Sequence, residues 1–208
     1  MTWRIRLTRF ASGHLVKQQE QVNSCGIACI LMLNFKIKKG LMAAGMRAGS
    51  AISAIPLPGA SYVGLTLSRS AIDMAVKSEP EVYKIYGDVV GTIYDGTSYT
   101  NCNRYPAVLA KLGLGLWNAV FVGEAGVAAA MKAAVKAGAP CIAHVVWGSG
   151  GAHFVCVDDV FSGLSGTEYA AVNDPGDADV ILTAIKDGTS IKYRDNTGTF
   201  SGWMVTRA

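Results

Sequence analysis

Cys25 stands at the head of an apolar segment, and its neighbours favour a reactive thiol. The run Ile27 to Phe35 is apolar nearly all round, which predicts a buried helix that begins near Cys25. A cysteine in the first turn of a helix lies at the positive end of the helix dipole, which favours thiolate over thiol. Gly26 leaves the approach to the sulfur open. Because the thiolate is the attacking species in acyl transfer, Cys25 is the candidate nucleophile.

A thiol nucleophile needs an imidazole within hydrogen-bond reach, and the chain has three histidines. His14 lies in a polar approach segment with no predicted strand to hold it. His144 lies inside a predicted buried strand, where a hydrogen-bonded core histidine is the ordinary occupant. His153 follows the glycines Gly150 and Gly151 and opens a β-rich run, so a rigid strand would hold it beside small residues that admit substrate. His153 is therefore the predicted general base.

A third group should orient the imidazole and stabilise its protonated form. Asp174 ends the next predicted strand, so a hairpin would bring its carboxylate beside His153. Cys25 and Cys29 with a histidine would be a rival use of these residues as metal ligands. A single Cys-x-x-x-Cys spacing without a second close pair is weak as a zinc pattern, so we expect no metal and no cofactor.

Four ordered features together resemble the papain-like cysteine peptidases of bacteria. They are Gln19 six residues before Cys25, the Cys25-Gly26 pair, the segment from Ala152 to Val157, and Asn173-Asp174-Pro175. The resemblance covers residues 16 to 176 and is closest in style to double-glycine peptidases that trim bacteriocin leaders, and to related secreted effector peptidases. It implies that Cys25 attacks, His153 shuttles the proton and Asp174 holds the ring. It also implies that Gln19 donates to the oxyanion together with the backbone N–H of Cys25.

For two roles in the resemblance, neighbouring residues offer an alternative. Gln18 and Gln21 flank Gln19 closely enough to serve as the oxyanion donor in its place. Asn173 is adjacent to Asp174, and many papain relatives use Asn in the third role. Both alternatives stay open on the sequence.

The elements that must position these residues change character along the chain. A strand-like run, Trp3 to Phe10, precedes the Cys25 segment, and residues 41–66 have the composition of a loop or loose helix. Helices are predicted over 68–77, 80–86, 105–112 and 124–136, with an irregular connection over 87–103 and a strand over 116–122. Strands are then predicted over 141–147, 152–158, 169–173, 192–193 and 199–205. Helices first and strands later predict an α+β fold with an antiparallel sheet.

Composition narrows the class of protein and its partners. Half of the 208 residues are hydrophobic, which suits one domain over 1–208 with a sizeable core. The net charge is +4 and the basic residues are scattered, so we expect no nucleic-acid partner. Five cysteines without regular spacing indicate reduced thiols. No apolar run is long enough for a membrane span, and the N-terminus shows no secretory signal. The expected location is the cytoplasm of the producing cell, with delivery into a recipient cell by a signal-less route.

The sequence therefore predicts a papain-like α+β fold, in which a helical lobe led by the Cys25 helix packs against a twisted antiparallel sheet. The predicted function is a cysteine peptidase acting on proteins or peptides, with Gly-Gly as the preferred cleavage position if the resemblance holds. A bacterial toxin or effector with a cognate inhibitor (immunity) protein fits the same resemblance. Deamidation or transamidation by the same thiolate, and a non-catalytic binding module, are the alternatives. Trp147 and Trp203 are the predicted cleft walls.

Overall fold

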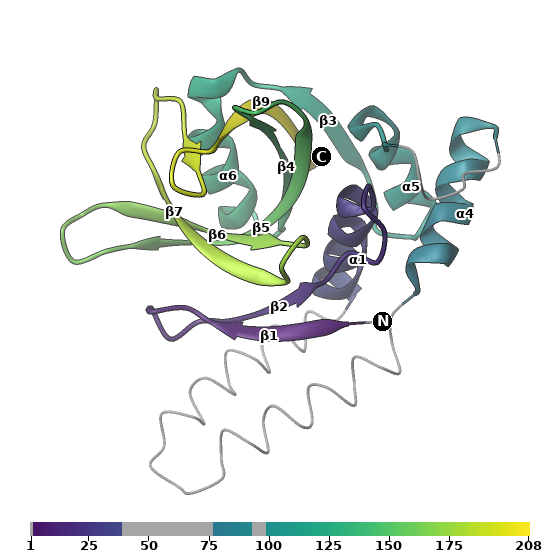
Figure 1. The fold of residues 1–208 in the computed structure, drawn as a ribbon, viewed down its shortest axis with the longest axis horizontal. Coiled ribbons are helices and arrows are strands. Elements are labelled where there is room, and N and C mark those ends of the chain that lie inside the picture. The colour runs from purple at the N-terminus through teal and green to yellow at the C-terminus, as the bar shows by residue number, and fades with distance from the viewer. Residues whose placement is uncertain (1, 39–76, 93–98) are drawn as a thin grey trace, which may run out of the picture.

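Three of the four described α-helices lie to one side of a large antiparallel sheet, and the fourth packs against the other face of that sheet (Figure 1). The computed structural model describes residues 2–38, 77–92 and 99–208. Most helices precede the large antiparallel sheet in the chain, which confirms the predicted mixture of helices and antiparallel strands. The predictions over 41–66 and 68–77 lie outside the described residues, except for Lys77, which is not helical.

The main sheet has seven strands, all antiparallel. Their order is β3-β9-β4-β5-β6-β7, and β8 pairs with the N-terminal end of β9, which β3 does not reach. The strand β7 was not predicted, because its residues do not alternate strictly between apolar and polar. It also placed the end of β5 four residues early. The bounds are β3 Trp117–Phe121, β4 Cys141–Trp147, β5 Ala152–Ser162, β6 Glu168–Asp174, β7 Asp179–Ile185, β8 Lys192–Tyr193 and β9 Gly198–Arg207.

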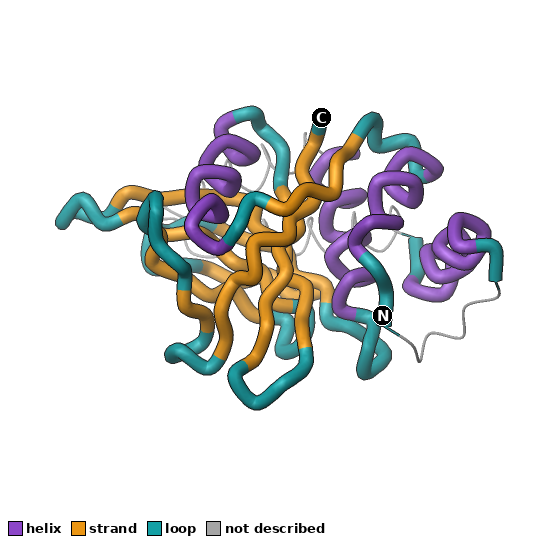
Figure 2. The backbone as a smooth tube through the Cα atoms, turned by 90° about the horizontal axis from the view of Figure 1, so that it is seen from above, coloured by secondary structure: helices purple, strands orange, loops and turns teal. Residues whose placement is uncertain are grey.

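The helices cover the two faces of this sheet (Figure 2). The α-helices are α1 Cys25–Lys38, α4 Glu79–Val90, α5 Tyr105–Lys111 and α6 Val127–Lys136, with short 3₁₀ turns at Cys102–Arg104 and Glu124–Gly126. The prediction of an irregular connection over 87–103 was wrong at both ends. There α4 continues to Val90, and the turn at 102–104 leads into α5.

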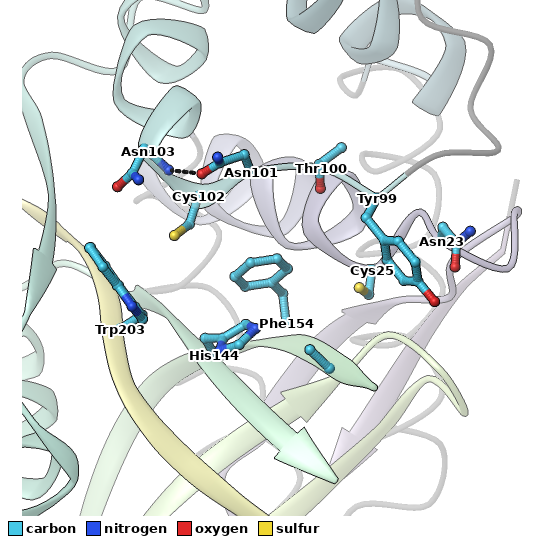
Figure 3. Close-up of a pocket in the computed structure, with 11 residues that line it drawn as sticks. Asn23, Cys25, Tyr99, Thr100, Asn101, Cys102, Asn103, His144, Phe154 and Trp203 are labelled. Carbon is cyan, nitrogen blue, oxygen red and sulfur yellow. Dashed lines mark hydrogen bonds between the residues drawn. The ribbon is translucent and has the colours of Figure 1, made fainter. Parts of the chain in front are cut away.

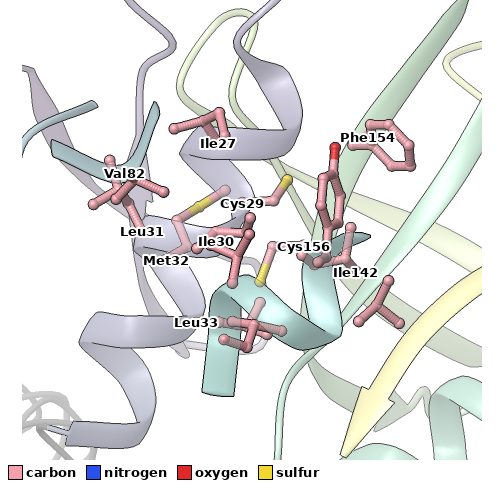
Figure 4. Packing of buried hydrophobic residues seen from close by; sticks show 14 of the residues in the cluster. Ile27, Cys29, Ile30, Leu31, Met32, Leu33, Val82, Ile142, Phe154 and Cys156 are labelled. Atoms are coloured by element: carbon pink, nitrogen blue, oxygen red, sulfur yellow. The ribbon is translucent and has the colours of Figure 1, made fainter. Parts of the chain in front are cut away.

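Alternation along β5 divides the core between the two faces. Phe154 and Cys156 pack with α1, α4 and α5 on one face, in the cluster that Figure 4 shows. Val155 and Val157 pack with α6 on the other face. Successive side chains of a strand point to opposite faces, so a single strand supplies both cores. The residues of α1 from Ile27 to Leu33 are fully buried, as the all-round apolar pattern predicts.

A two-stranded hairpin lies beside the main sheet and precedes α1. It consists of β1 Trp3–Leu7 and β2 Gly13–Lys17. This corrects the sequence interpretation of His14 as part of a polar segment without a strand. His14 lies in β2 opposite Arg6 and is only 2% exposed. The five residues from 13 to 17 do not alternate between polar and apolar, so this short run carried little sequence signal for a strand.

The start of α4 ties the loop before α1 to the rest of the fold. Ser78 and Glu81 form a capping box at the N-terminus of α4. The neighbouring Glu79 is buried and accepts the backbone N–H of Glu20 through both carboxylate oxygens, at 3.0 and 3.1 Å. Its charge is matched by the buried ammonium of Lys17 at 3.3 Å. These contacts fix the chain a few residues before Cys25.

Candidate active site

The structure places Cys25 in the first turn of α1, nearly buried at 7% exposure but on the wall of a pocket. The pocket has a volume of about 450 Å³. Figure 3 shows the sulfur of Cys25 facing this space from the end of the helix. The thiol therefore faces the pocket, while α1 from Ile27 to Phe35 is buried.

His153, at the start of β5, stands between Cys25 and Asp174. Its Nε2 lies 2.8 Å from Oδ1 of Asp174. Burial by itself would lower the pKa of His153, but hydrogen bonds with Asp174 and with Cys25, together with their charges, raise the pKa to about 9. Since Nε2 is engaged by Asp174, Nδ1 is the nitrogen left for Cys25. An imidazole held between a thiol and a carboxylate can carry a proton to and from the sulfur.

The hairpin between β5 and β6 brings Asp174 to His153, as its place at the end of a strand predicted. Asn173 pairs with Cys156 in this hairpin. Its side chain points to the face of the sheet opposite that of its neighbour Asp174. Nδ2 of Asn173 donates to the carbonyl of Cys156 at 3.0 Å and to Oδ1 of Asp158 at 2.7 Å. Of the two adjacent residues, Asp174 is therefore the one that contacts His153.

Gln19 lies at the same end of the molecule, but its amide is directed into its own loop. The backbone N–H of Gln19 donates to the carbonyl of Pro175 at 2.9 Å, which fixes the loop against the turn after Asp174. Nε2 of Gln19 donates to the carbonyls of Gln21 and Val22, at 2.9 and 2.8 Å. Its buried Oε1 has no partner. In this arrangement both amide N–H groups are used within the loop, so the oxyanion role of Gln19 stays a prediction.

The pocket beside Cys25 has aromatic and amide walls (Figure 3). Sequence reasoning anticipated Trp203 as a wall residue but missed Asn23, Tyr99 and the stretch from Thr100 to Asn103. The predicted wall residue Trp147 instead packs near the ring of His153, with 5.8 Å between the ring centroids. The lining is Asn23, Cys25, Tyr99, Thr100, Asn101, Cys102, Asn103, His144, Ala152, Phe154 and Trp203. No Asp, Glu, Lys or Arg is among these described lining residues.

An irregularity in β9 directs two side chains to the site. The register between β4 and β9 shifts between Ala143 and Val145, so that Ser201, Gly202 and Trp203 bulge from the ladder. Gly202 has φ of +93°, and an added Cβ would come within 2.6 Å of the backbone of Gly123, so only glycine fits. The bulge places Trp203 on the pocket wall and Oγ of Ser201 within 2.8 Å of Nδ1 of His144. A glycine inside a predicted strand was the available signal.

His144 corrects the expectation of a core histidine. It is half-buried in β4, lines the pocket and lies 4.9 Å, ring to ring, from Phe154. Burial and then the positive charge of His153 lower the pKa of His144. It is therefore a neutral wall of the pocket near pH 7, next to the base but not part of the hydrogen-bonded set.

The structure gives a different reason for a glycine at position 26 from the open access to the sulfur that the sequence suggested. A Cβ on Gly26 would lie 1.7 Å from the hydroxyl of Tyr105 and 2.7 Å from Oγ1 of Thr100. These two oxygens are hydrogen-bonded at 2.5 Å. Gly26 therefore admits the close packing of Tyr105 beside the first turn of α1, which brings the 99–103 segment to the pocket.

The remaining thiols differ from Cys25 in their setting. All five cysteines are unpaired. Burial raises the pKa of Cys29, Cys102, Cys141 and Cys156, so these four are protonated at neutral pH. Across the three described stretches of chain, no three His, Cys, Asp or Glu side chains gather as a metal site. Within those same stretches, no helix is long and apolar enough to cross a membrane.

No protein-family model matches the chain, and no curated protein sequence matches it.

Proposed function

We propose that this protein is a cysteine peptidase with a papain-like arrangement of helix and sheet. The observation that carries the proposal is the position of His153, which is hydrogen-bonded to Asp174 at 2.8 Å and whose pKa is raised by its interactions with Asp174 and Cys25. Cys25 is the nucleophile, His153 the general base and acid, and Asp174 the residue that orients the ring. The sequence resemblance to bacterial papain-like peptidases supports the same assignment.

The reaction follows from these groups. His153 takes the proton of Cys25, and the thiolate attacks the carbonyl carbon of a peptide bond. The C–N bond then breaks as His153 returns the proton to the leaving amine, which leaves a thioester on Cys25. Water attacks the thioester, with His153 accepting its proton and passing it to the departing sulfur. Each cycle restores the thiol of Cys25 and returns Cys25 and His153 to their original total charge.

The oxyanion of the tetrahedral intermediate needs N–H donors. The backbone N–H of Cys25 belongs to the first turn of α1, where N–H groups have no partner within the helix. Gln19 is the second donor implied by the resemblance, and Asn23 is an amide that the structure places on the pocket wall. The two are separated by comparing kcat of Gln19→Ala and Asn23→Ala. The true donor is the one whose loss lowers kcat by roughly 10²–10³-fold.

The pocket defines the substrate class. A polypeptide whose scissile carbonyl reaches Cys25 would place a neighbouring side chain against Phe154, Trp203 and His144. Walls without an ionised side chain favour an uncharged residue there, because a charge would lose its hydration without gaining a partner. The preference for Gly-Gly at the cleavage position rests on the resemblance alone, as does the role of a toxin or effector held in check by an inhibitor protein.

Cleavage-site profiling tests the proposal. A denatured proteome is incubated with the wild-type protein and, as the control, with Cys25→Ala. The expected result is new peptide termini that appear only with the wild type and that cluster on uncharged residues. A gain of about one dalton at glutamine without chain cleavage would assign deamidation to the same thiol instead. Absence of both changes, with a thiol of ordinary reactivity toward iodoacetamide, would support the binding module and overturn the proposal.

A further inference from the structure

The carboxylate of Asp174 accepts hydrogen bonds from several groups besides the histidine that it orients. Oδ1 accepts the backbone N–H of Gly176 at 2.7 Å in addition to facing His153. Oδ2 accepts the hydroxyl of Tyr193 at 2.6 Å, and Nε and Nη2 of Arg194 lie 3.0 and 2.8 Å from it. Neither Tyr193 nor Arg194 was singled out by the sequence, because they lie 19 and 20 residues beyond Asp174.

An unusual turn brings Arg194 to this carboxylate. Arg194, Asp195 and Asn196 are three successive residues with positive φ, at 45°, 51° and 67°. Left-handed conformations cost non-glycine residues roughly 1–2 kcal/mol each, so the surroundings must hold the turn. The carbonyl of Arg194 accepts both the N–H and the hydroxyl of Thr197. Arg194 also pairs with Asp177 at 2.6 Å. The turn thus points the guanidinium back toward Asp174.

We propose that Tyr193 and Arg194 are positioning residues of the active site, which lock Asp174 so that Oδ1 faces His153 and which offset part of its negative charge. This inference rests on the proposed function of Cys25 and His153. Tyr193 is buried and supplies a neutral donor, whereas Arg194 supplies a cation on the side of the carboxylate away from the imidazole. With Oδ2 fully occupied, the carboxylate cannot rotate without losing these bonds.

The charge balance gives the direction of the effect. A lone carboxylate beside His153 would favour the imidazolium strongly, and the cation on Oδ2 weakens that attraction. Loss of Arg194 should therefore raise the pKa of His153, which would make the imidazolium a poorer acid toward the leaving amine. The titratable and charged groups that face this His153–Asp174 pair are Cys25 and Cys29 from α1, His144 from β4, Tyr193 from β8, and Arg194 with its partner Asp177.

Proton NMR titration of the histidine rings measures this directly, because the chain has only three histidines. The His153 resonance is assigned by its loss in His153→Gln, and the wild type is expected to titrate near pH 9. Arg194→Gln should move that midpoint up by about half a pH unit or more. Tyr193→Phe should move it in the same direction by less and keeps the packing of the ring against Trp147 and Phe200. Arg194→Lys, which retains the cation, should stay close to the wild type.

Two controls distinguish a failure of the positioning role from a failure of the proposed function. Lys192→Gln removes a cation two residues away whose ammonium donates to Thr199, so it should leave the midpoint unchanged. Cys25→Ala should lower the midpoint, because the sulfur supports the imidazolium. A wild-type midpoint near 6.5 that Cys25→Ala leaves in place would overturn the proposed function. A midpoint that responds to Cys25→Ala but not to Arg194→Gln or Tyr193→Phe would overturn the positioning role alone.

Discussion

The molecule contains two histidine–carboxylate pairs, and their surroundings give them different roles. His153 and Asp174 meet at 2.8 Å beside Cys25, whereas His14 of β2 and Asp158 of β5 meet at 2.9 Å. The first pair has a thiol within hydrogen-bond reach at a pocket. The second has the ammonium of Lys36, from the C-terminal half of α1. The same pair of side chains is thus suited to proton transfer in one place and to holding elements together in the other.

Both clusters draw on the same three elements. The helix α1 supplies Cys25 and Lys36, the strand β5 supplies His153 and Asp158, and the strand β6 supplies Asp174 and Asn173. A register shift between Val157 and Asp159 leaves Asp158 unpaired in the β5–β6 ladder. Its carboxylate turns to Lys36 and His14. The charge of Lys36 and the interactions with His14 outweigh the cost of burial and hold the pKa of Asp158 far below its usual range.

The largest difference between the pairs should appear in activity. His153→Ala removes the base and should lower the peptidase rate by at least about 10³-fold, because the groups of such a site act as a unit. His14→Ala should change the rate little, since His14 contacts neither Cys25 nor the pocket lining. Both variants are assayed on the substrate found by profiling, at a temperature where circular dichroism shows them folded. Equal losses in the two variants would break the distinction.

Stability should show the reverse order. Asp158→Ala leaves the ammonium of Lys36 without its partner at 7% exposure, and breaking a buried ion pair in this way costs roughly 3–5 kcal/mol of unfolding free energy. Urea titration measures the loss, with Asp159→Ala, one residue along the strand, as the matched control. The thiol of Cys25 in the folded variant should keep its reactivity. A loss under about 1 kcal/mol would mean that the cluster does not hold α1 to β5.

The pH dependence should distinguish the pairs further. The folded-state pKa of His153, about 9, lies above the ordinary value of 6.5. Its contribution to stability is therefore complete below about pH 6.5 and is lost as the pH rises through about 9. Thermal midpoints from pH 6 to pH 10 should fall more steeply for the wild type than for His153→Gln. Parallel curves would show that His153 is not held as the imidazolium in the folded protein.

The smallest expected effect concerns Asn173, which sits beside Asp174 but serves the other cluster. Asn173→Ala removes the donor to Asp158 at 2.7 Å and should cost about 1.5–3 kcal/mol of stability, the range for hydrogen bonds to charged groups. The NMR titration of His153 should not move. A shifted titration would give Asn173 a part in orienting the imidazole and would weaken the assignment of that role to Asp174.

The sequence determined the local features of this protein. Apolar residues all round from Ile27 to Leu33 require a buried helix, and the position of Cys25 places the thiol in its first turn. Two β-rich runs joined by a short connection require a hairpin, which brings Asp174 to His153. Each of these follows from residues near one another in the chain, where periodicity and turn chemistry act directly.

Only the tertiary structure decided the contacts between distant segments. Tyr193 reaches Asp174 from the end of β8, and Arg194 reaches it from the left-handed turn that follows, which no residue pattern predicts. His14 is buried because β2 packs against α1, β6 and β7, and the pocket wall at 99–103 reaches Cys25 because Gly26 admits Tyr105. Contacts across such sequence separations depend on how whole elements pack, and a single chain carries no local signal for them.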